Sequence, residues 1–266
     1  MGWMTVRRPV LRMRAGRAAQ RADTLAVEEP LMIRIGAVTL TMTMRTPGHD
    51  FDLLAGWLVS EGTVAAASDI IEMRACPDEE NTVEVVLAPG LRPPQPRAFT
   101  TTSACGVCGS DSIDGIFKAM TWPVDHDDVR VDLAVVAALP ELMRSEQKIF
   151  DRTGGLHAAG IYTSAGEKVA VREDVGRHNA VDKVIGAALL ADRLPLTGHV
   201  LQVSGRASFE LVQKAAMAGI PVLAAVSAPS SLAVDLAARC GITLVGFVRG
   251  GGMNVYTRPD RVRVGR

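Results

Sequence analysis

Two pairs of short, apolar-rich runs lie in the first third of the chain, and each pair flanks a turn. The runs are 31–35 with 38–44, and 70–74 with 83–87. Such runs on both sides of a turn predict two β-hairpins. Between them, apolar residues in 51–60 recur at helical spacing. This spacing predicts a helix that Asp50 opens and Gly62 stops.

The pattern changes after residue 156, where short apolar runs alternate with helical periods. The predicted strands are 156–162, 168–172, 199–203, 222–226 and 243–247, with an edge strand at 254–257. The predicted helices are 177–191, 209–218 and 231–239. Two more helices are expected upstream, at 111–120 and 131–145, the latter broken or bent at Pro140. Such alternation indicates an α/β fold with a mixed, mostly parallel sheet.

These patterns divide the chain into three segments. Residues 1–24 contain six arginines and no helical or strand period, so we expect a flexible tail. An electrostatic attraction for an acidic partner is the alternative role of this segment. Residues 25–125 are expected to form an α+β domain that ends in a loop at 100–110. Residues 126–266 are expected to form an α/β cofactor-binding domain.

The amino-acid composition and the net charge argue against several classes of protein. The 266 residues are 48% hydrophobic and 22% charged, which excludes disorder over the whole chain. The 29 basic and 29 acidic side chains balance, which argues against a broad nucleic-acid or anionic-membrane surface. No apolar run reaches the ~18 residues of a membrane span. The N-terminus lacks the apolar middle of a signal peptide, so we expect a chain that is not exported.

Cys105 and Cys108 form a C-x-x-C in a stretch rich in Thr and Gly. Four cysteines in an unexported chain favour chemistry over a disulfide scaffold. The spacing fits half of a zinc site, a redox pair, or a nucleophilic thiol that carries a persulfide, and it does not choose among them. Cys76 and Cys240 are expected to be structural, because an isolated cysteine commonly acts as a small hydrophobe.

Small and hydroxyl-bearing residues follow three predicted strands, at 204–208, 227–231 and 248–252. The carboxyl ends of parallel strands form the edge where α/β sheets bind ligands. Backbone N–H groups in such turns bind phosphates, and Arg206 and Arg249 would add charge. The alternative is three ordinary turns that cap helices. Neither the P-loop pattern nor the G-x-G-x-x-G pattern is present.

A third group of polar residues surrounds the predicted helix start at Arg177. Arg172, Arg177 and His178 crowd a helix end that repels cations, which suits an anion site better than it suits helix stability. Asp174 could simply cap this helix. His157 lies upstream, and the pattern leaves open whether it is functional or a buried core histidine.

These segments together resemble the FdhD family of formate dehydrogenase accessory sulfur carriers, over roughly residues 25–258. The matching motifs are 46–48 (TPG), 51–53 (FDL), 60–62 (SEG), 104–109 (ACGVCG), 153–159 (TGGLHAA), 173–180 (EDVGRHNA), 204–208 (SGRAS) and 249–256 (RGGGMNVY). Their ordered series is far more specific than the C-x-x-C alone.

The resemblance implies a sulfurtransferase with a cytidine-deaminase-like, three-layer C-terminal domain. Cys105 would accept persulfide sulfur from a cysteine desulfurase, with Cys108 as an auxiliary thiol. The sulfur would go to the bis-guanine-dinucleotide molybdenum cofactor, needed for formate dehydrogenase activity. The family further implies a cytoplasmic homodimer with no resident metal. Together with the phosphate argument, it assigns cofactor binding to Phe247, Val248, Arg249, Gly250, Gly251, Gly252, Ser204, Gly205, Arg206, Arg177 and His178.

Two other functions share features of this sequence. A zinc deaminase needs H-x-E upstream of P-C-x-x-C. None of the five histidines is followed by Glu at the second position, and Ala104 precedes Cys105, so deamination is excluded. The second rival is a cofactor-binding chaperone without enzymatic activity, whose cysteines sense redox state. A gain of one sulfur on Cys105 would distinguish the carrier from this chaperone.

Overall fold

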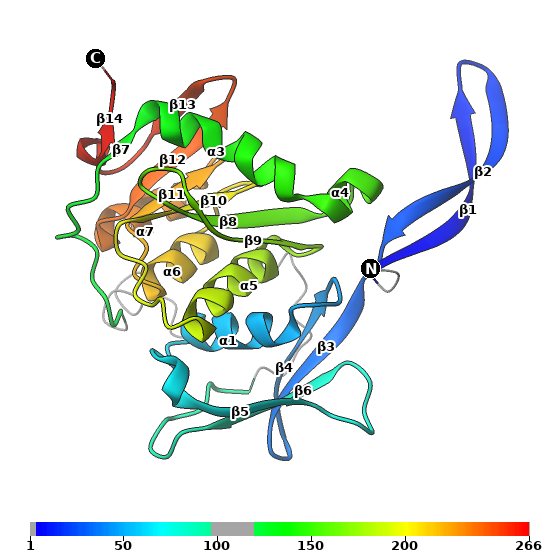
Figure 1. Cartoon of the computed structure of the whole chain (residues 1–266), viewed down its shortest axis with the longest axis horizontal. Coiled ribbons are helices and arrows are strands. Elements are labelled where there is room, and N and C mark those ends of the chain that lie inside the picture. Colours follow the sequence, from blue (N-terminus) through cyan, green and yellow to red (C-terminus); the bar gives the residue numbers. More distant parts are fainter. Residues whose placement is uncertain (1–3, 97–119, 266) are drawn as a thin grey trace.

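The computed structural model describes residues 4–96 and 120–265. Its N-terminal part holds a four-stranded sheet in the order β4-β3-β6-β5, with helix α1 packed on one face (Figure 1). The elements of this part are β1 (Thr5–Arg14), β2 (Arg17–Ala26), β3 (Glu29–Ile35), β4 (Val38–Arg45), α1 (Asp50–Ser60), η2 (Ala67–Asp69), β5 (Ile70–Ala75) and β6 (Thr82–Leu87). The two predicted hairpins and the predicted helix are confirmed.

The C-terminal part is built on a six-stranded sheet in the order β13-β12-β11-β10-β8-β9. Its elements are β7 (Val131–Asp132), α3 (Leu133–Glu146), α4 (Lys148–Thr153), β8 (His157–Thr163), β9 (Lys168–Asp174), α5 (Arg177–Leu190), β10 (His199–Val203), α6 (Phe209–Met217), β11 (Val222–Ala225), α7 (Ser231–Cys240), β12 (Thr243–Arg249), β13 (Gly252–Val255), η3 (Pro259–Arg261) and β14 (Val262–Arg263). Helix α3 lies on one face and helices α5, α6 and α7 on the other, which makes three layers (Figure 1).

The α/β class is confirmed, but the large sheet is not mostly parallel. Strands β10, β11 and β12 run parallel to one another. The pairings β8–β9, β8–β10 and β12–β13 are antiparallel. The reason is local, because β8 leads to β9, and β12 to β13, through short turns that only antiparallel strands can use. Three parallel strands therefore form the centre of a mixed sheet.

The N-terminal segment is a hairpin, and the predicted flexible tail is wrong for the described residues. Strands β1 and β2 pair antiparallel over ten residues each. Ala15 and Gly16 connect them with φ angles of 44° and 77°. Two positive φ angles are typical of hairpin turns that match the twist of the strands. The pattern was missed because arginine and alanine occupy positions where a strand usually shows apolar alternation.

One helical prediction needs correction, one helix was missed, and one prediction falls outside the described residues. Helix α3 continues through Pro140, so the helix is not broken there, and the alternative of a bend stays a prediction. Helix α4 was not predicted, because its six residues are too few to show a helical period. The predicted helix at 111–120 lies outside the described residues apart from Met120.

One hydrophobic cluster extends through both parts of the chain. It includes Leu54 of α1, Ile185 of α5 and Leu223 of β11. Asp182 of α5 strengthens the same junction, since its carboxylate accepts a hydrogen bond from the hydroxyl of Ser60 in α1 at 2.7 Å and lies 2.8 Å from the ammonium of Lys214 in α6. The predicted domain boundary at 125/126 stays a prediction. In the described residues, no helix has the length and apolar character needed to cross a bilayer.

Candidate functional site

The turns that follow β10 and β11 lie side by side at one edge of the large sheet. Ser230 donates its backbone N–H to the carbonyl of Ala207 at 3.0 Å, and Ser227 donates to the carbonyl of Gly205 at 3.4 Å. Phe247 of β12 donates to the carbonyl of Ser227 at 3.2 Å. Three neighbouring parallel strands bring these segments together, because their carboxyl ends must share an edge.

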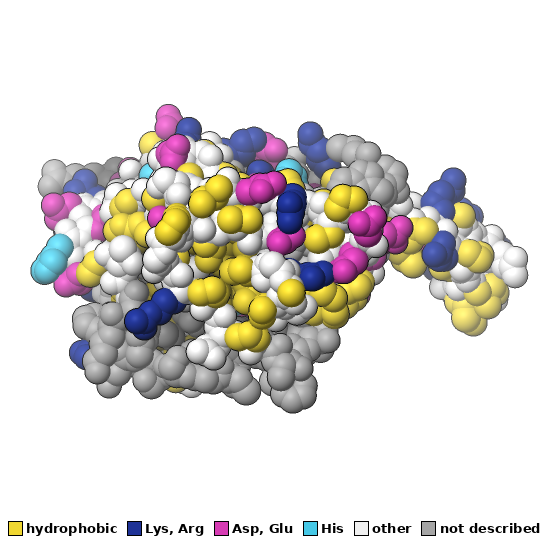
Figure 2. Space-filling model, turned by 90° about the horizontal axis from the view of Figure 1, so that it is seen from below, with side chains coloured by type: hydrophobic (Ala, Val, Ile, Leu, Met, Phe, Trp, Pro, Cys, Tyr) yellow, Lys and Arg dark blue, Asp and Glu magenta, His cyan; other side chains and the backbone are white. Residues whose placement is uncertain are grey.

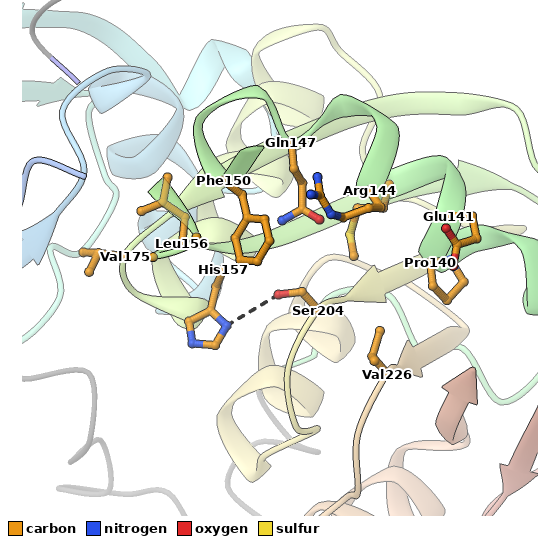
Figure 3. Close-up of a pocket in the computed structure, with 13 residues that line it drawn as sticks. Pro140, Glu141, Arg144, Gln147, Phe150, Leu156, His157, Val175, Ser204 and Val226 are labelled. Atoms are coloured by element: carbon orange, nitrogen blue, oxygen red, sulfur yellow. Dashed lines mark hydrogen bonds between the residues drawn. The ribbon is translucent and has the colours of Figure 1, made fainter. Parts of the chain in front are cut away.

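A pocket of about 620 Å³ opens beside this edge, between the sheet and helices α3 and α4 (Figure 3). This volume suits a drug-sized ligand. Its polar lining converges from separate elements, with Gln147 between the helices, His157 at the start of β8 and Ser204 after β10. The complete lining is Pro140, Glu141, Met143, Arg144, Gln147, Phe150, Gly154, Gly155, Leu156, His157, Val175, Ser204 and Val226.

The helical wall of the pocket is held by Glu173, the first residue of the EDVGRHNA motif. Its carboxylate accepts backbone N–H groups of Ile149 at 3.0 Å and Phe150 at 2.7 Å. These are free donors in the first turn of α4, so the carboxylate caps that helix. The ring of Phe150 lies 4.8 Å from the guanidinium of Arg144. Glu173 therefore positions the aromatic side of the pocket.

His157 and Ser204 link the pocket to the sheet edge. The Ser204 hydroxyl accepts the backbone N–H of Ala158 at 2.9 Å and lies 3.5 Å from Nδ1 of His157 (Figure 3). Burial lowers the pKa of His157, and the charges of Arg177 and His178 lower it further. His157 thus favours its neutral form, in which one ring nitrogen is an acceptor.

Gly205 lies between His157, which lines the pocket, and Arg177, which together with His178 forms a cationic cluster at the start of α5. A Cβ at Gly205 would lie 3.5 Å from the His157 ring and 4.0 Å from Cδ of Arg177. The backbone can therefore approach a ligand here between an imidazole and a guanidinium. Arg177 opens α5, whose N-terminal N–H groups add a positive dipole end.

His178 is held in place by α6. Its Nε2 lies 2.7 Å from Oε2 of Glu210 and 3.3 Å from the Ser208 hydroxyl. Burial acts to raise the pKa of Glu210, but the hydrogen bond and charge of His178 outweigh it and lower this pKa. Glu210 is a residue that the sequence analysis missed, since a glutamate in the first turn of a helix is commonplace.

The predicted cofactor segment 247–252 has an irregular backbone. A bulge interrupts the β12–β13 pairing between Gly246 and Arg249, and Phe247 has a φ of 54°. Positive φ at an aromatic residue is strained, and such strain clusters at functional sites. The Arg249 guanidinium lies 5.5 Å from the Phe247 ring. Val248 is buried, whereas Arg249 and Gly250–Gly252 are exposed.

The structure brings some predicted residues together and leaves others apart. Arg177 and the ring of His157 lie beside Gly205, and the hydroxyl of Ser204 lies 3.5 Å from the same ring. His178 contacts Ser208, at the other end of the 204–208 turn. Arg206 is exposed, and the hairpin turn at 250–251 follows β12 and leads to β13 instead of a helix. Ser204 is the one predicted cofactor-binding residue that lines the pocket. The assignment of these residues to a cofactor stays a prediction.

Only some of the cysteines discussed above lie in the described residues. Cys105, Cys108 and the loop at 100–110 lie outside the described residues. Cys240 is buried, and burial raises the pKa of its thiol to about 11, which disfavours the reactive thiolate. Within 4–96 and 120–265, no three His, Cys, Asp or Glu side chains are grouped to hold a metal. A zinc site that uses Cys105 and Cys108 therefore stays a hypothesis.

Comparison with known proteins gives a consistent result. The family model described as FdhD/NarQ matches residues 26–263. A Streptomyces coelicolor protein named sulfur carrier protein FdhD is 56% identical, covering 98% of this chain and 97% of its own. The Mycobacterium tuberculosis protein of the same name is 52% identical, covering 98% and 100%.

A solved structure has the same fold. It is the crystal structure of a proposed formate dehydrogenase accessory protein from Desulfotalea psychrophila, at a TM-score of 0.80 and 25% identity. The match covers 98% of this chain and all of that one.

Proposed function

The chain belongs to the FdhD/NarQ family, and on this premise we propose that it is a sulfur carrier for the maturation of formate dehydrogenase. The proposal is supported by relatives of that name that align along almost the whole chain. The observation that carries it is the family match over 26–263, because this range includes both cysteines of the C-x-x-C.

The proposed chemistry begins with persulfide transfer to Cys105. The Cys105 thiolate attacks the outer sulfur of a persulfide on a cysteine desulfurase. The sulfur–sulfur bond of the donor breaks as the new one forms, and the donor cysteine leaves as a thiolate. The exchange needs no separate oxidant or reductant, because the transferred sulfur keeps its oxidation state. Cys108 acts as the auxiliary thiol beside the carrier.

The proposed acceptor is the bis-guanine-dinucleotide molybdenum cofactor, bound as cargo at the carboxyl edge of the large sheet. Arg177, His178 and the turn at 204–208 supply cations and N–H groups that suit phosphates. Phe247 and Arg249 offer an aromatic face and a guanidinium beside it. The pocket with Phe150 and His157 adjoins the same edge and gives a second place for a ring or sugar.

The same proposal covers location and partners. The carrier works in the cytoplasm with a cysteine desulfurase and with formate dehydrogenase, and it forms a homodimer. It makes no specific contact with nucleic acid or membranes. These statements follow the family resemblance, and the neutral net charge agrees with them.

Mass spectrometry of the intact protein tests the carrier function. After incubation with a cysteine desulfurase and cysteine, we expect a gain of one sulfur on Cys105. Cys105→Ala abolishes this gain and the maturation of formate dehydrogenase, while guanine-nucleotide binding persists. Cys108→Ala is milder, and Cys240→Ala, which removes a buried thiol, is the matched control.

Three outcomes would overturn parts of this proposal. Equal loading of the Cys105→Ala variant refutes Cys105 as the carrier. Cofactor binding without any sulfur loading favours the redox-sensing chaperone. A stoichiometric zinc that both cysteine variants lose identifies the pair as half of a metal site.

A further inference from the structure

His157 lies where the pocket meets the cationic start of α5. It lines the pocket, and the backbone of Gly205 lies between its ring and Arg177. Nδ1 of the ring faces the Ser204 hydroxyl at 3.5 Å, and Nε2 points away from that hydroxyl (Figure 3). Among the described residues, Nε2 has no hydrogen-bond partner. One ring nitrogen is therefore available to a ligand.

The charged groups nearest to this ring favour its neutral form. Burial lowers the pKa of His157 most, Arg177 and His178 of α5 lower it further, and Asp174 of β9 raises it. The Asp174 carboxylate lies 2.7 Å from the ammonium of Lys183, which offsets its negative charge. The cations beside the imidazole therefore outweigh the anion.

The other charged groups around the pocket do not change this balance. Arg144 and Glu141 of α3 line the same pocket. Glu173 of β9 faces α4 and accepts backbone N–H groups there, and Glu210 of α6 lies 2.7 Å from His178. In the part of the chain that the structure describes, no carboxylate forms an ion pair with the ring of His157. An anion that favours the imidazolium must therefore come from a ligand.

The surface of the molecule does not supply a general attraction for anions. The net charge of the chain is zero. Outside the β1–β2 hairpin, acidic and basic side chains are interspersed on the face of the molecule in Figure 2. An anion is therefore recognised by the groups that surround Gly205 and not by the field of the whole protein.

The proposed cargo brings the missing negative charge. A guanine dinucleotide joins its two halves through a diphosphate, in which both phosphates are esterified and each carries one negative charge. An opposite charge within about 4–6 Å favours the charged form of a titratable group. A diphosphate beside Gly205 would therefore reverse the effect of the cations on His157. The N–H groups at the start of α5 suit the same anion.

We propose that His157 takes up a proton from solvent when a diphosphate of the cargo binds beside Gly205, so that an imidazolium and the guanidinium of Arg177 hold the anion from two sides. This proton uptake rests on the proposed binding of the cargo at the sheet edge, and it makes that binding depend on pH. No covalent bond changes, and the proton returns to solvent when the cargo leaves. The empty site avoids the cost of one more buried cation.

The direction of the pH dependence follows from this linkage. The bound diphosphate raises the pKa of the imidazole above its value in the empty site. Between these two pKa values, the complex holds one proton more than the free protein does. The affinity therefore falls as the pH rises through this interval, by up to about tenfold per pH unit, and it levels off outside the interval.

Titration calorimetry with GDP-mannose tests the proposal. Both phosphates of this probe are esterified, whereas a terminal phosphate titrates near pH 6 and would contribute protons of its own. Titrations at one pH in buffers of different ionisation enthalpy give the number of protons taken up per bound probe. For wild type we expect a maximum of at least about 0.5 proton between about pH 6 and pH 8.

Two variants assign the proton to a residue. His157→Gln keeps a side chain that forms hydrogen bonds and does not titrate, so proton uptake and the pH dependence of the affinity are lost. His126→Gln removes a histidine whose side chain is 95% exposed, and it keeps both. The ring resonances of His157 in the wild type, followed by NMR over pH with and without the probe, give the same answer without any variant.

The outcomes separate this proposal from the function on which it rests. Binding of the probe without proton uptake overturns the proposal and leaves cargo binding in place. So does uptake that persists in His157→Gln, or a His157 resonance whose titration the probe does not shift. Absence of binding from pH 5.5 to 8.5 overturns the cargo site and the proposal with it. Sulfur loading on Cys105 is measured without the probe and tests the carrier function separately.

Discussion

Gly56 of α1 and Gly186 of α5 face each other where the two helices cross. A Cβ at Gly56 would lie 1.8 Å from the carbonyl oxygen of Asp182, and one at Gly186 would lie 1.9 Å from that of Asp52. No side chain larger than hydrogen fits at such distances, so the two backbones are in direct contact. This crossing joins α1 of the N-terminal part to α5, the helix that begins at Arg177 and His178.

Replacement of Gly56 by alanine is therefore expected to destabilise the fold. Alanine normally stabilises a helix by about 1 kcal/mol relative to glycine. Here the overlap with backbone atoms forces α1 and α5 apart, and we expect Gly56→Ala to lower the free energy of unfolding by about 3 kcal/mol. Gly252→Ala is the control, because its Cβ meets nothing closer than 3.9 Å. Equal denaturant midpoints for the two variants would contradict this prediction.

Asp174 lies three residues before α5 begins at Arg177, and it forms a buried ion pair with Lys183 of that helix. The Lys183 ammonium lies 2.7 Å from the Asp174 carboxylate and donates to the carbonyl of Thr46 at 2.8 Å. Lys183→Met leaves a buried carboxylate without its cation, which costs about 3–5 kcal/mol. The double variant Asp174→Asn/Lys183→Met recovers part of that loss. Chemical denaturation measures both, and a double variant as unstable as the sum of the single changes would refute the coupling.

The stability of the protein should depend on pH through His157. Its folded-state pKa is lowered, so between about pH 6.5 and that lower value the unfolded chain binds the proton and the native state does not. The free energy of unfolding therefore falls as the pH decreases below about 6.5.

His157→Gln should flatten this part of the pH profile, because glutamine does not titrate. Thermal unfolding from pH 8 to pH 5 measures the difference between variant and wild type. His126→Gln controls for the loss of an exposed histidine, since the His126 side chain is 95% exposed. Parallel profiles for wild type and His157→Gln would show that another group causes the acid sensitivity.

Arg249 should contribute to guanine-nucleotide binding. If it contacts a phosphate, Arg249→Ala weakens binding by about tenfold, which corresponds to about 1.4 kcal/mol. The remaining affinity depends less on salt, because one screened charge pair is gone. Titration calorimetry with GDP at two salt concentrations measures both effects. Arg263→Ala, at another exposed arginine, should bind like wild type. Unchanged affinity of Arg249→Ala would move the site away from 247–252.

Phe247 allows a separate test of backbone strain. Both Phe247→Ala and Phe247→Gly remove the ring beside Arg249, so both should weaken nucleotide binding. Glycine accepts a φ of 54° without the Cβ clash, so Phe247→Gly should be about 1 kcal/mol more stable than Phe247→Ala. Equal stability would mean that the left-handed backbone at 247 stores no strain.

The sequence determined the elements with a clear apolar pattern, and it determined the family. Helix α1 was found from apolar residues at helical spacing, and the hairpin of β3 and β4 from apolar-rich runs on both sides of a turn. Strands β10, β11 and β12 were found because strands that are buried on both faces form continuous apolar runs. Family membership was equally accessible, because motifs such as 153–159 and 173–180 depend on residue identity and order. The β1–β2 hairpin was missed because its exposed strands bury too little to leave an apolar pattern.

The tertiary structure alone decided which of these elements meet. Period shows that a face is buried and does not show what covers it. Thr46 donates its backbone N–H to Asp174, 128 positions along the chain, and Glu173 caps α4, which no helical period predicted. The pocket between α3, α4 and the sheet edge follows from these contacts. The crossing at Gly56 and Gly186 likewise depends on contact between segments that are far apart in the sequence, which local spacing treats separately.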